Sequence, residues 1–299
     1  MSSTEIARMN TVESINLAMP RPAGHSRTSV EELYAMMLDE VRDPRYNDRE
    51  LALFSDPVWY YGRYLNPASR NYALRNADAN VSVAIQYLGS DASSVRLLDL
   101  GCGLGMQSII FAALGSDVVG VDVSEECVAL CRKRKQYFEQ RLHRELNLRF
   151  VALDFKKADA DSLGRQFDAL FSMSAFAHIR PLQETVAKVA DLLTASGRVF
   201  LWDQNPGYLL LDSLGLNRRR VSRPNHIREE LARHGFTTEL LRGACAIPRQ
   251  LWREGILEHT ASQLNSVLNK SMTLSFSYLL GAARNPAQLK SEAQFAKLS

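Results

Sequence analysis

The chain has 299 residues, of which 46% are hydrophobic and 23% are charged, a composition that supports a sizeable buried core. Its 36 basic residues nearly balance 33 acidic ones, and a net charge of +3 argues against nucleic acid as a partner. No apolar run reaches the roughly 18 residues of a membrane span, and the polar N-terminus lacks the apolar core of a secretory signal. These features predict a cytoplasmic protein without a membrane partner.

The four cysteines show no pattern typical of a metal site. They lack CxxC pairs and have no histidine at zinc-finger spacing, so we expect reduced thiols and no bound metal. They are Cys102, Cys127, Cys131 and Cys245.

Residues 1–90 are predicted to form an N-terminal tail and a helical cap or lid. Residues 1–28 show no sustained periodicity and are either a mobile tail or a segment that orders over a site. A capping-box pattern, Ser29-Val30-Glu31-Glu32, opens a helix that ends at Asp43-Pro44. A second helix is expected near Asn47 and a longer one over about 67–88.

An aromatic segment lies between these helices and contains Trp59, Tyr60, Tyr61, Arg63 and Tyr64. It is predicted either to cover a bound ligand as a lid or to belong to the core, because an aromatic stripe at helical spacing is more often core.

From Val95 onward, short β-rich runs alternate with helical stretches, which is typical of parallel βαβ units. The expected strands are 95–100, 117–122, 147–152, 168–173, 197–203, 236–244 and 272–282. The expected helices are 105–114, 125–142, 159–164, 181–194 and an insertion at 249–269. Residues 91–299 therefore predict an α/β fold with a seven-stranded, Rossmann-like, doubly wound sheet, mostly parallel with an antiparallel last strand.

A glycine-rich turn follows the first of these strands, with glycines at 101, 103 and 105 and Asp99 before them. The glycines permit a tight turn, close approach of backbone N–H groups to a ligand, and close packing of the next helix. The second strand ends in Asp122, about 20 residues beyond the first glycine, where such folds place a carboxylate against ribose hydroxyls. Alternatively, Asp122 caps the helix that begins near Ser124.

The glycine spacing is G-x-G-x-G rather than the G-x-G-x-x-G of nicotinamide and flavin sites. With Asp99 and Asp122, it resembles the class I S-adenosylmethionine-dependent methyltransferases over about residues 95–205. The resemblance implies S-adenosyl-L-methionine as the cofactor, with the turn against its methionine part. It implies cofactor contacts for Asp99, Gly101, Cys102, Gly103, Gly105, Asp122, Val123, Asp154, Phe155, Ser172 and Met173.

The third and fourth strands end in further motifs of this family. By the resemblance, Asp154 accepts from the adenine amine and Phe155 forms an apolar wall; the alternative is that Asp154 caps a turn.

The fourth strand leads to His178, at the edge that faces the sulfonium and the acceptor. A neutral imidazole there is a candidate base, although His178 is equally able to cap or pack the following helix. Many similar enzymes carry an acid where Ser174-Ala175 stands.

The predicted acceptor contacts are His178, the tyrosines Tyr60, Tyr61 and Tyr64, and Asp203 and Asn205 after the fifth strand. Asn205 precedes Pro206-Gly207, so an equal alternative is that these side chains make hydrogen bonds within a local turn.

The chain has two basic clusters. The cluster of Arg218 to Arg220 with Arg223 and His226 either meets an anionic substrate or is a solvated loop. The other, Arg132 to Lys135, is predicted to be a solvated helix face.

Together these patterns predict a small-molecule methyltransferase that acts by in-line displacement, more readily on oxygen than on nitrogen, with a homodimer possible. Alternatives are an N-methyltransferase, a nucleic-acid methyltransferase and a non-catalytic binding subunit that retains the fold. A nicotinamide oxidoreductase is disfavoured by the glycine spacing and by the lack of an obvious Tyr-x-x-x-Lys pair.

Overall fold

A computed structural model describes residues 28–55, 79–89, 95–158, 160–164, 166–208, 221–246 and 256–285. The aromatic segment 59–64 and the arginines 218–220 lie outside these ranges. The elements in chain order are α2 (Val30–Glu40), α3 (Asp48–Ser55), β1 (Arg96–Leu100), α6 (Met106–Leu114), β2 (Asp117–Asp122), α7 (Glu125–Leu142), β3 (Leu148–Ala152), α8 (Ala160–Leu163), β4 (Phe167–Met173), η1 (Phe176–His178), α9 (Leu182–Leu192), β5 (Leu193–Gln204), α11 (Pro224–Arg233), β6 (Phe236–Ala244), α12 (Ile256–Leu268), η3 (Met272–Leu274) and β7 (Ser277–Arg284).

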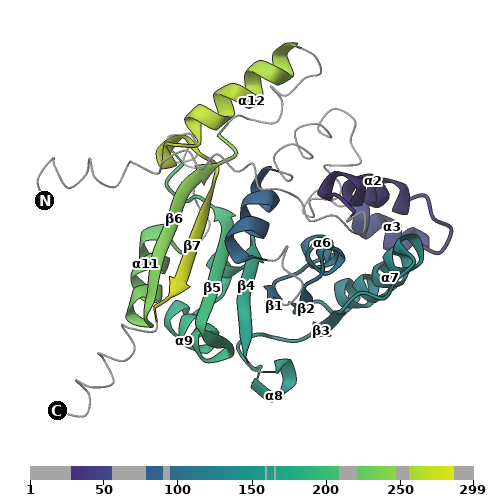
Figure 1. Ribbon diagram of the computed structural model, residues 1–299, viewed down its shortest axis with the longest axis horizontal. Helices are drawn as coiled ribbons and strands as arrows, with labels where there is room; N and C mark the ends of the chain where they lie inside the picture. The colour runs from purple at the N-terminus through teal and green to yellow at the C-terminus, as the bar shows by residue number, and fades with distance from the viewer. Residues whose placement is uncertain are drawn as a thin grey trace, which may run out of the picture.

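The sheet has seven strands in the order β3-β2-β1-β4-β5-β7-β6 (Figure 1). Neighbouring strands from β3 to β5 are parallel, and β7 is antiparallel to both β5 and β6. The predicted Rossmann-like sheet with an antiparallel last strand is confirmed. Strand order reverses at β1 and β4, which are neighbours, and ligands of such sheets bind beyond the carboxyl ends of the strands at this switch point.

Two hydrophobic cores fill the two faces of the sheet. One joins α6 and α7 to the N-terminal helices, with Leu33, Met37 and Phe54 almost or fully buried. The other packs α9 and α11 against the sheet, through residues such as Val186 and Ile227. Helices α2 and α3 lie beside α7 in Figure 1, so this part of the N-terminal region shares a core with the sheet.

The capping box that the sequence predicts for α2 is present, and α3 begins with an equivalent pair of hydrogen bonds. The Ser29 hydroxyl accepts from the Glu32 N–H at 3.1 Å, and the Glu32 carboxylate accepts from the Ser29 N–H at 2.6 Å. Asn47 and Glu50 exchange equivalent bonds of 2.9 and 3.0 Å at the start of α3. Satisfying these N–H groups fixes where both helices begin.

The structure differs from the sequence-based expectations in three places. Helix α11 was not predicted, although Pro224 occupies its first turn and Ile227 and Leu231 form its buried stripe. The last strand begins at Ser277, because Met272–Leu274 forms a 3-10 turn. The predicted solvated face at 132–135 is wrong for Arg134, which is fully buried.

None of the helices in the described ranges is long and apolar enough to cross a bilayer.

Candidate functional site

The glycine turn follows β1 at the switch point of the sheet. Gly101, Gly103 and Gly105 have φ angles of 76°, 52° and 69°, a region that other residues enter only under strain. The N–H groups of Gly101 and Cys102 both donate to the Val121 carbonyl, at 2.8 and 2.9 Å. A Cβ on Gly101 would stand 2.2 Å from the Ala175 Cβ, so the turn lies directly against the segment after β4.

Asp122 ends β2 beside this turn and is partly exposed. One carboxylate oxygen accepts from the Gly103 N–H and the other from the Ser124 N–H, each at 2.9 Å. Ser124 rather than Asp122 caps α7, since its hydroxyl accepts from the Cys127 N–H. The carboxylate is therefore held in a fixed orientation and keeps acceptor capacity on both oxygens.

An apolar side chain next to Asp122 is exposed. Val123 has 75% of its surface accessible, although residues 118–121 of the preceding strand β2 are buried. An exposed apolar residue beside a fixed carboxylate suits a ligand with an apolar ring next to a hydroxylated group.

Asp99 lies beneath the turn rather than on its surface. Only 2% of it is exposed, and the Ser108 hydroxyl of α6 donates to it at 2.5 Å. Burial raises the pKa of Asp99 to about 7, and the negative charge of Asp122 adds to this rise. The side chain thus joins β1 to α6 below the site.

Two cysteines contact the turn from inside. Cys131 of α7 donates to the Gly103 carbonyl at 3.2 Å. A hydrogen bond with Cys131, together with burial, raises the pKa of the Cys102 thiol. The Cys102 thiol therefore remains protonated at neutral pH and serves as a packing group, not as a nucleophile.

The residues after β3 make local contacts, and the predicted adenine contact of Asp154 stays a prediction. The Asp154 carboxylate accepts from the Lys156 N–H at 3.1 Å, as in a turn cap. Phe155 is only 5% exposed, and the Lys188 ammonium of α9 lies 5.6 Å from its ring centroid. The Phe155 ring is therefore mostly buried, and its role as an adenine wall stays a prediction.

Two neighbouring residues at the end of β4 differ in their exposure: Ser172 is buried and Met173 is partly exposed. Ser172 is fully buried, donates to the Leu100 carbonyl at 2.8 Å and accepts from the Phe176 N–H at 3.2 Å, so its side chain links β1 to η1. The predicted cofactor contact of Ser172 stays a prediction. Met173 is partly exposed, and its sulfur lies 3.7 Å from the Gln107 amide nitrogen.

His178 is the last residue of η1 and is exposed. It follows Ala175, the residue that touches the glycine turn. The N-cap of α9 is Pro181, so the alternative in which His178 caps that helix is wrong.

The two polar residues near the end of β5, which are predicted to contact the acceptor, are buried. Asp203 is 0% exposed and accepts from the Ala177 N–H at 3.1 Å, and burial raises its pKa to about 7. Asn205 is 3% exposed; its amide donates to the Met272 and Ser275 carbonyls, and its oxygen accepts from the Gly207 N–H. Asp203 thus holds η1 in place, and Asn205 satisfies its turn.

Three residues that hold the site escaped prediction: Ser108, Cys131 and Arg134. The only sequence signal was that Cys131 and Arg134 are spaced i, i+3, which places them on one face of α7. The sequence does not show that this face of α7 lies against the glycine turn.

Comparison with known proteins assigns a family model to the centre of the chain. Residues 97–197 match a model described as a methyltransferase domain. A methyltransferase of Schizosaccharomyces pombe whose role is uncharacterised is 30% identical over 113 residues, which are 37% of this chain and 39% of that protein. A ubiquinone biosynthesis O-methyltransferase of Ruegeria pomeroyi is 29% identical over 138 residues, 44% of this chain and 50% of the relative. The chain thus spans half or less of the length of these two relatives.

Solved structures of low identity share the fold. A magnesium protoporphyrin IX methyltransferase from Synechocystis with bound S-adenosylhomocysteine is 18% identical, with a TM-score of 0.53 over 84% of this chain and 100% of that one. An S-adenosylmethionine-dependent methyltransferase from Mesorhizobium loti is 17% identical, with a TM-score of 0.51 over 70% of this chain and 98% of its own. At such identities the likeness concerns the fold.

Proposed function

The chain carries a methyltransferase domain of the class I, Rossmann-like fold, and from this we propose that it methylates a hydroxyl oxygen of a small molecule with S-adenosylmethionine as the donor. The O-methyltransferase among its relatives supports oxygen as the acceptor atom.

The residues at the switch point fit this cofactor. Asp122 presents a fixed carboxylate suited to two ribose hydroxyls. Val123 offers an exposed apolar surface next to it, suited to an adenine face. The glycine turn brings backbone close to the ligand, and α6 begins directly after the turn, with Gly105 at its N-cap.

One observation carries the proposal: the turn after β1 and the segment after β4 are in contact. The Ala175 Cβ occupies the space that a side chain at Gly101 would need. His178 follows Ala175 on η1 and lies beyond the same edge of the sheet as the glycine turn.

When bound, S-adenosylmethionine would supply an electrophilic methyl group on a sulfonium. The protein then has to align the acceptor oxygen with that methyl group and to exclude water. In the proposed mechanism, His178 takes the hydroxyl proton as charge leaves the oxygen. Asp203 supports this geometry by holding the Ala177 N–H next to His178.

Calorimetry with S-adenosylmethionine and S-adenosylhomocysteine tests the donor. We expect saturable binding of both and no binding of NAD or FAD. A screen of hydroxylated metabolites, read by mass spectrometry, is expected to yield a product heavier by one methyl group. Binding of the dinucleotides in place of the two sulfur ligands would contradict the proposal.

Asp122→Asn is expected to weaken S-adenosylhomocysteine binding about 10- to 100-fold, because hydrogen bonds to a charged group contribute roughly 1.5–3 kcal/mol. The amide keeps one acceptor oxygen but loses the charge. Calorimetry measures the Kd directly.

Asp117→Asn is the matched control for this change. It lies at the other end of β2, is largely exposed, and pairs with Arg96 at 3.5 Å. We expect its Kd to equal that of the wild type. Equal losses in the two variants would mean that Asp122 has no direct role in the ribose site.

A further inference from the structure

Helix α7 donates two hydrogen bonds into the cofactor turn. Cys131 donates to the Gly103 carbonyl at 3.2 Å, and the Arg134 guanidinium donates to the carbonyl of the next residue, Leu104. Both donors lie on one face of α7, one turn apart. The turn is therefore attached to α7 through two consecutive peptide groups.

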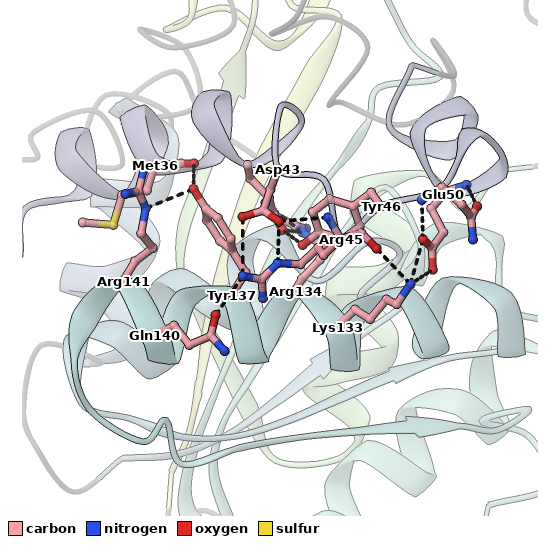
Figure 2. Close-up of polar contacts among 12 residues, drawn as sticks. Met36, Asp43, Arg45, Tyr46, Glu50, Lys133, Arg134, Tyr137, Gln140 and Arg141 are labelled. Atoms are coloured by element: carbon pink, nitrogen blue, oxygen red, sulfur yellow. Dashed lines mark hydrogen bonds and ion pairs between the residues drawn. The ribbon is translucent and has the colours of Figure 1, made fainter.

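Arg134 is itself held by a carboxylate from the N-terminal region. Its Nε lies 3.0 and 3.1 Å from the two Glu40 oxygens, and its second terminal nitrogen lies 2.9 Å from Oε2. Both side chains have an exposed fraction of 0%. The Tyr46 hydroxyl donates to Glu40 at 2.7 Å, which completes a buried cluster between α2 and α7. Figure 2 shows the Tyr46 and Arg134 side chains of this cluster.

Aromatic rings fix the guanidinium from the sides. The Arg134 Cζ lies 5.5 Å from the centroid of Phe54 on α3 and 6.0 Å from that of Phe138 on α7. With Glu40 and the Leu104 carbonyl also in place, the orientation of the guanidinium is set by α2, α3 and α7 together.

A second ion pair joins the N-terminal helices to α7 and serves as a comparison. Lys133, the residue before Arg134, donates to both oxygens of Glu50 on α3 at 2.6 and 2.9 Å and to the Arg45 carbonyl (Figure 2). Its side chain is 41% exposed. This pair ties α3 to α7, but its partners belong to the N-terminal helices and not to the turn.

Holding a carbonyl also orients the N–H of the same peptide, because the peptide group is planar and the two bonds point in opposite directions. Fixing the Gly103 and Leu104 carbonyls toward α7 therefore directs the N–H groups of Leu104 and Gly105 away from α7. The Gly105 N–H reaches the Cys102 carbonyl at 2.8 Å, which closes the turn.

Stability alone is a weak reason for such a pair. A buried ion pair generally adds little net stability compared with apolar side chains of the same volume, since two charges must be desolvated. A role in geometry accounts for charges at this place.

We propose that Arg134 is a positioning residue of the cofactor site and that Glu40 orients it, so that cofactor affinity depends on the docking of α2 onto α7. The inference rests on the proposed function, because it concerns the S-adenosylmethionine site. It adds to that function a dependence of the donor site on the N-terminal helices.

The test uses an apolar triple variant of the full chain, Glu40→Leu with Tyr46→Phe and Arg134→Met. These changes remove every charged and hydroxyl group of the cluster, so no buried charge is left alone and the thermal midpoint is expected to stay near the wild-type value. We expect the Kd for S-adenosylhomocysteine to rise about tenfold, equivalent to about 1.4 kcal/mol. We also expect faster amide hydrogen exchange in residues 101–105.

Glu50→Gln is the matched control, since it breaks the neighbouring pair in the same interface. It is expected to leave both the Kd and the exchange of the turn unchanged. Glu40→Gln alone is expected to weaken binding as the triple variant does, and its thermal midpoint shows how much stability the lone charge costs.

The outcomes separate the two proposals. A triple variant that folds and binds S-adenosylhomocysteine with the wild-type Kd overturns the positioning role while leaving the function intact. Failure of the wild-type protein to bind overturns the proposed function and this inference with it. If the triple variant does not fold, the same binding ratio is read from Arg134→Lys, which keeps the charge but loses the fixed fork; an unchanged Kd there also overturns the proposal.

Discussion

Replacing His178 with glutamine is expected to lower kcat about 10²- to 10⁴-fold, the usual contribution of a general base. Glutamine preserves size and hydrogen-bonding capacity but cannot take a proton at neutral pH. Because the imidazole acts on the acceptor and not on the donor, the Kd for S-adenosylhomocysteine is expected to stay within about twofold of the wild-type value, under roughly 0.5 kcal/mol. Steady-state turnover on the methylated metabolite and calorimetry measure the two quantities.

His143→Asn is the matched control. His143 ends α7 in the left-handed region, with φ of 52°, which asparagine tolerates well. It lies at the carboxyl end of a helix that begins directly after β2, so it is at the opposite edge of the sheet from His178. Its turnover is expected to match the wild type; a similar loss in both variants would indicate a general effect of removing histidine.

The pH profile sharpens this test. Burial raises the pKa of both Asp99 and Asp203 to about 7, so a wild-type acid limb has more than one conceivable source. If His178 is the base, kcat rises with pH as the imidazole loses its proton, and this limb disappears in His178→Gln. A limb that persists unchanged in the variant would assign the titration to a buried carboxyl and remove His178 from the mechanism.

Gly101→Ala is expected to lower the free energy of unfolding by about 2–5 kcal/mol. Two costs add: a left-handed φ for a residue with a Cβ costs about 1–2 kcal/mol, and overpacking costs about 1–3 kcal/mol. The new Cβ would stand 2.2 Å from the Ala175 Cβ, so the turn and the segment after β4 must separate. We also expect loss of S-adenosylhomocysteine binding. Urea unfolding and calorimetry measure the two effects.

Gly89→Ala provides a comparison in which only one of these costs applies. Gly89 has a φ of 67°, and a Cβ there would meet nothing within 4 Å. The expected cost is therefore about 1–2 kcal/mol from the backbone alone. Equal losses of unfolding free energy at the two positions would show that the contact with Ala175 is unimportant.

Local patterns were sufficient for most of the sheet and its helices. The predicted strands 117–122 and 236–244 coincide with β2 and β6, and the predicted helix 125–142 coincides with α7. An apolar run defines β2, and the Ser124 cap defines the start of α7. Helix α11 was missed because it buries few residues and carries many charges. Its buried stripe is meaningful only once α9 and the sheet are known to lie beneath it.

The candidate site also contains features that local patterns predict and features that they do not. The glycine turn was predictable as local structure because a tight turn requires particular residue types at particular spacings, whereas the cofactor contacts of the turn and of Asp122 stay a prediction. The burial of Asp203 and Asn205 was not predicted, since sequence position gives the edge of the sheet but not the exposure of the side chain. Arg134 was assigned to solvent because its partner, Glu40, is 94 residues away. Pairings at such separations leave no trace in local composition.

Asn205 joins two parts of the sheet edge that are far apart in the sequence. Its amide nitrogen donates to the carbonyls of Met272 and Ser275, which lie 67 and 70 residues further along the chain. One side chain thus fastens the segment between β6 and β7 to the end of β5, at the same edge as the cofactor turn. The position of η3 at this edge therefore depends on a residue that belongs to neither β6 nor β7.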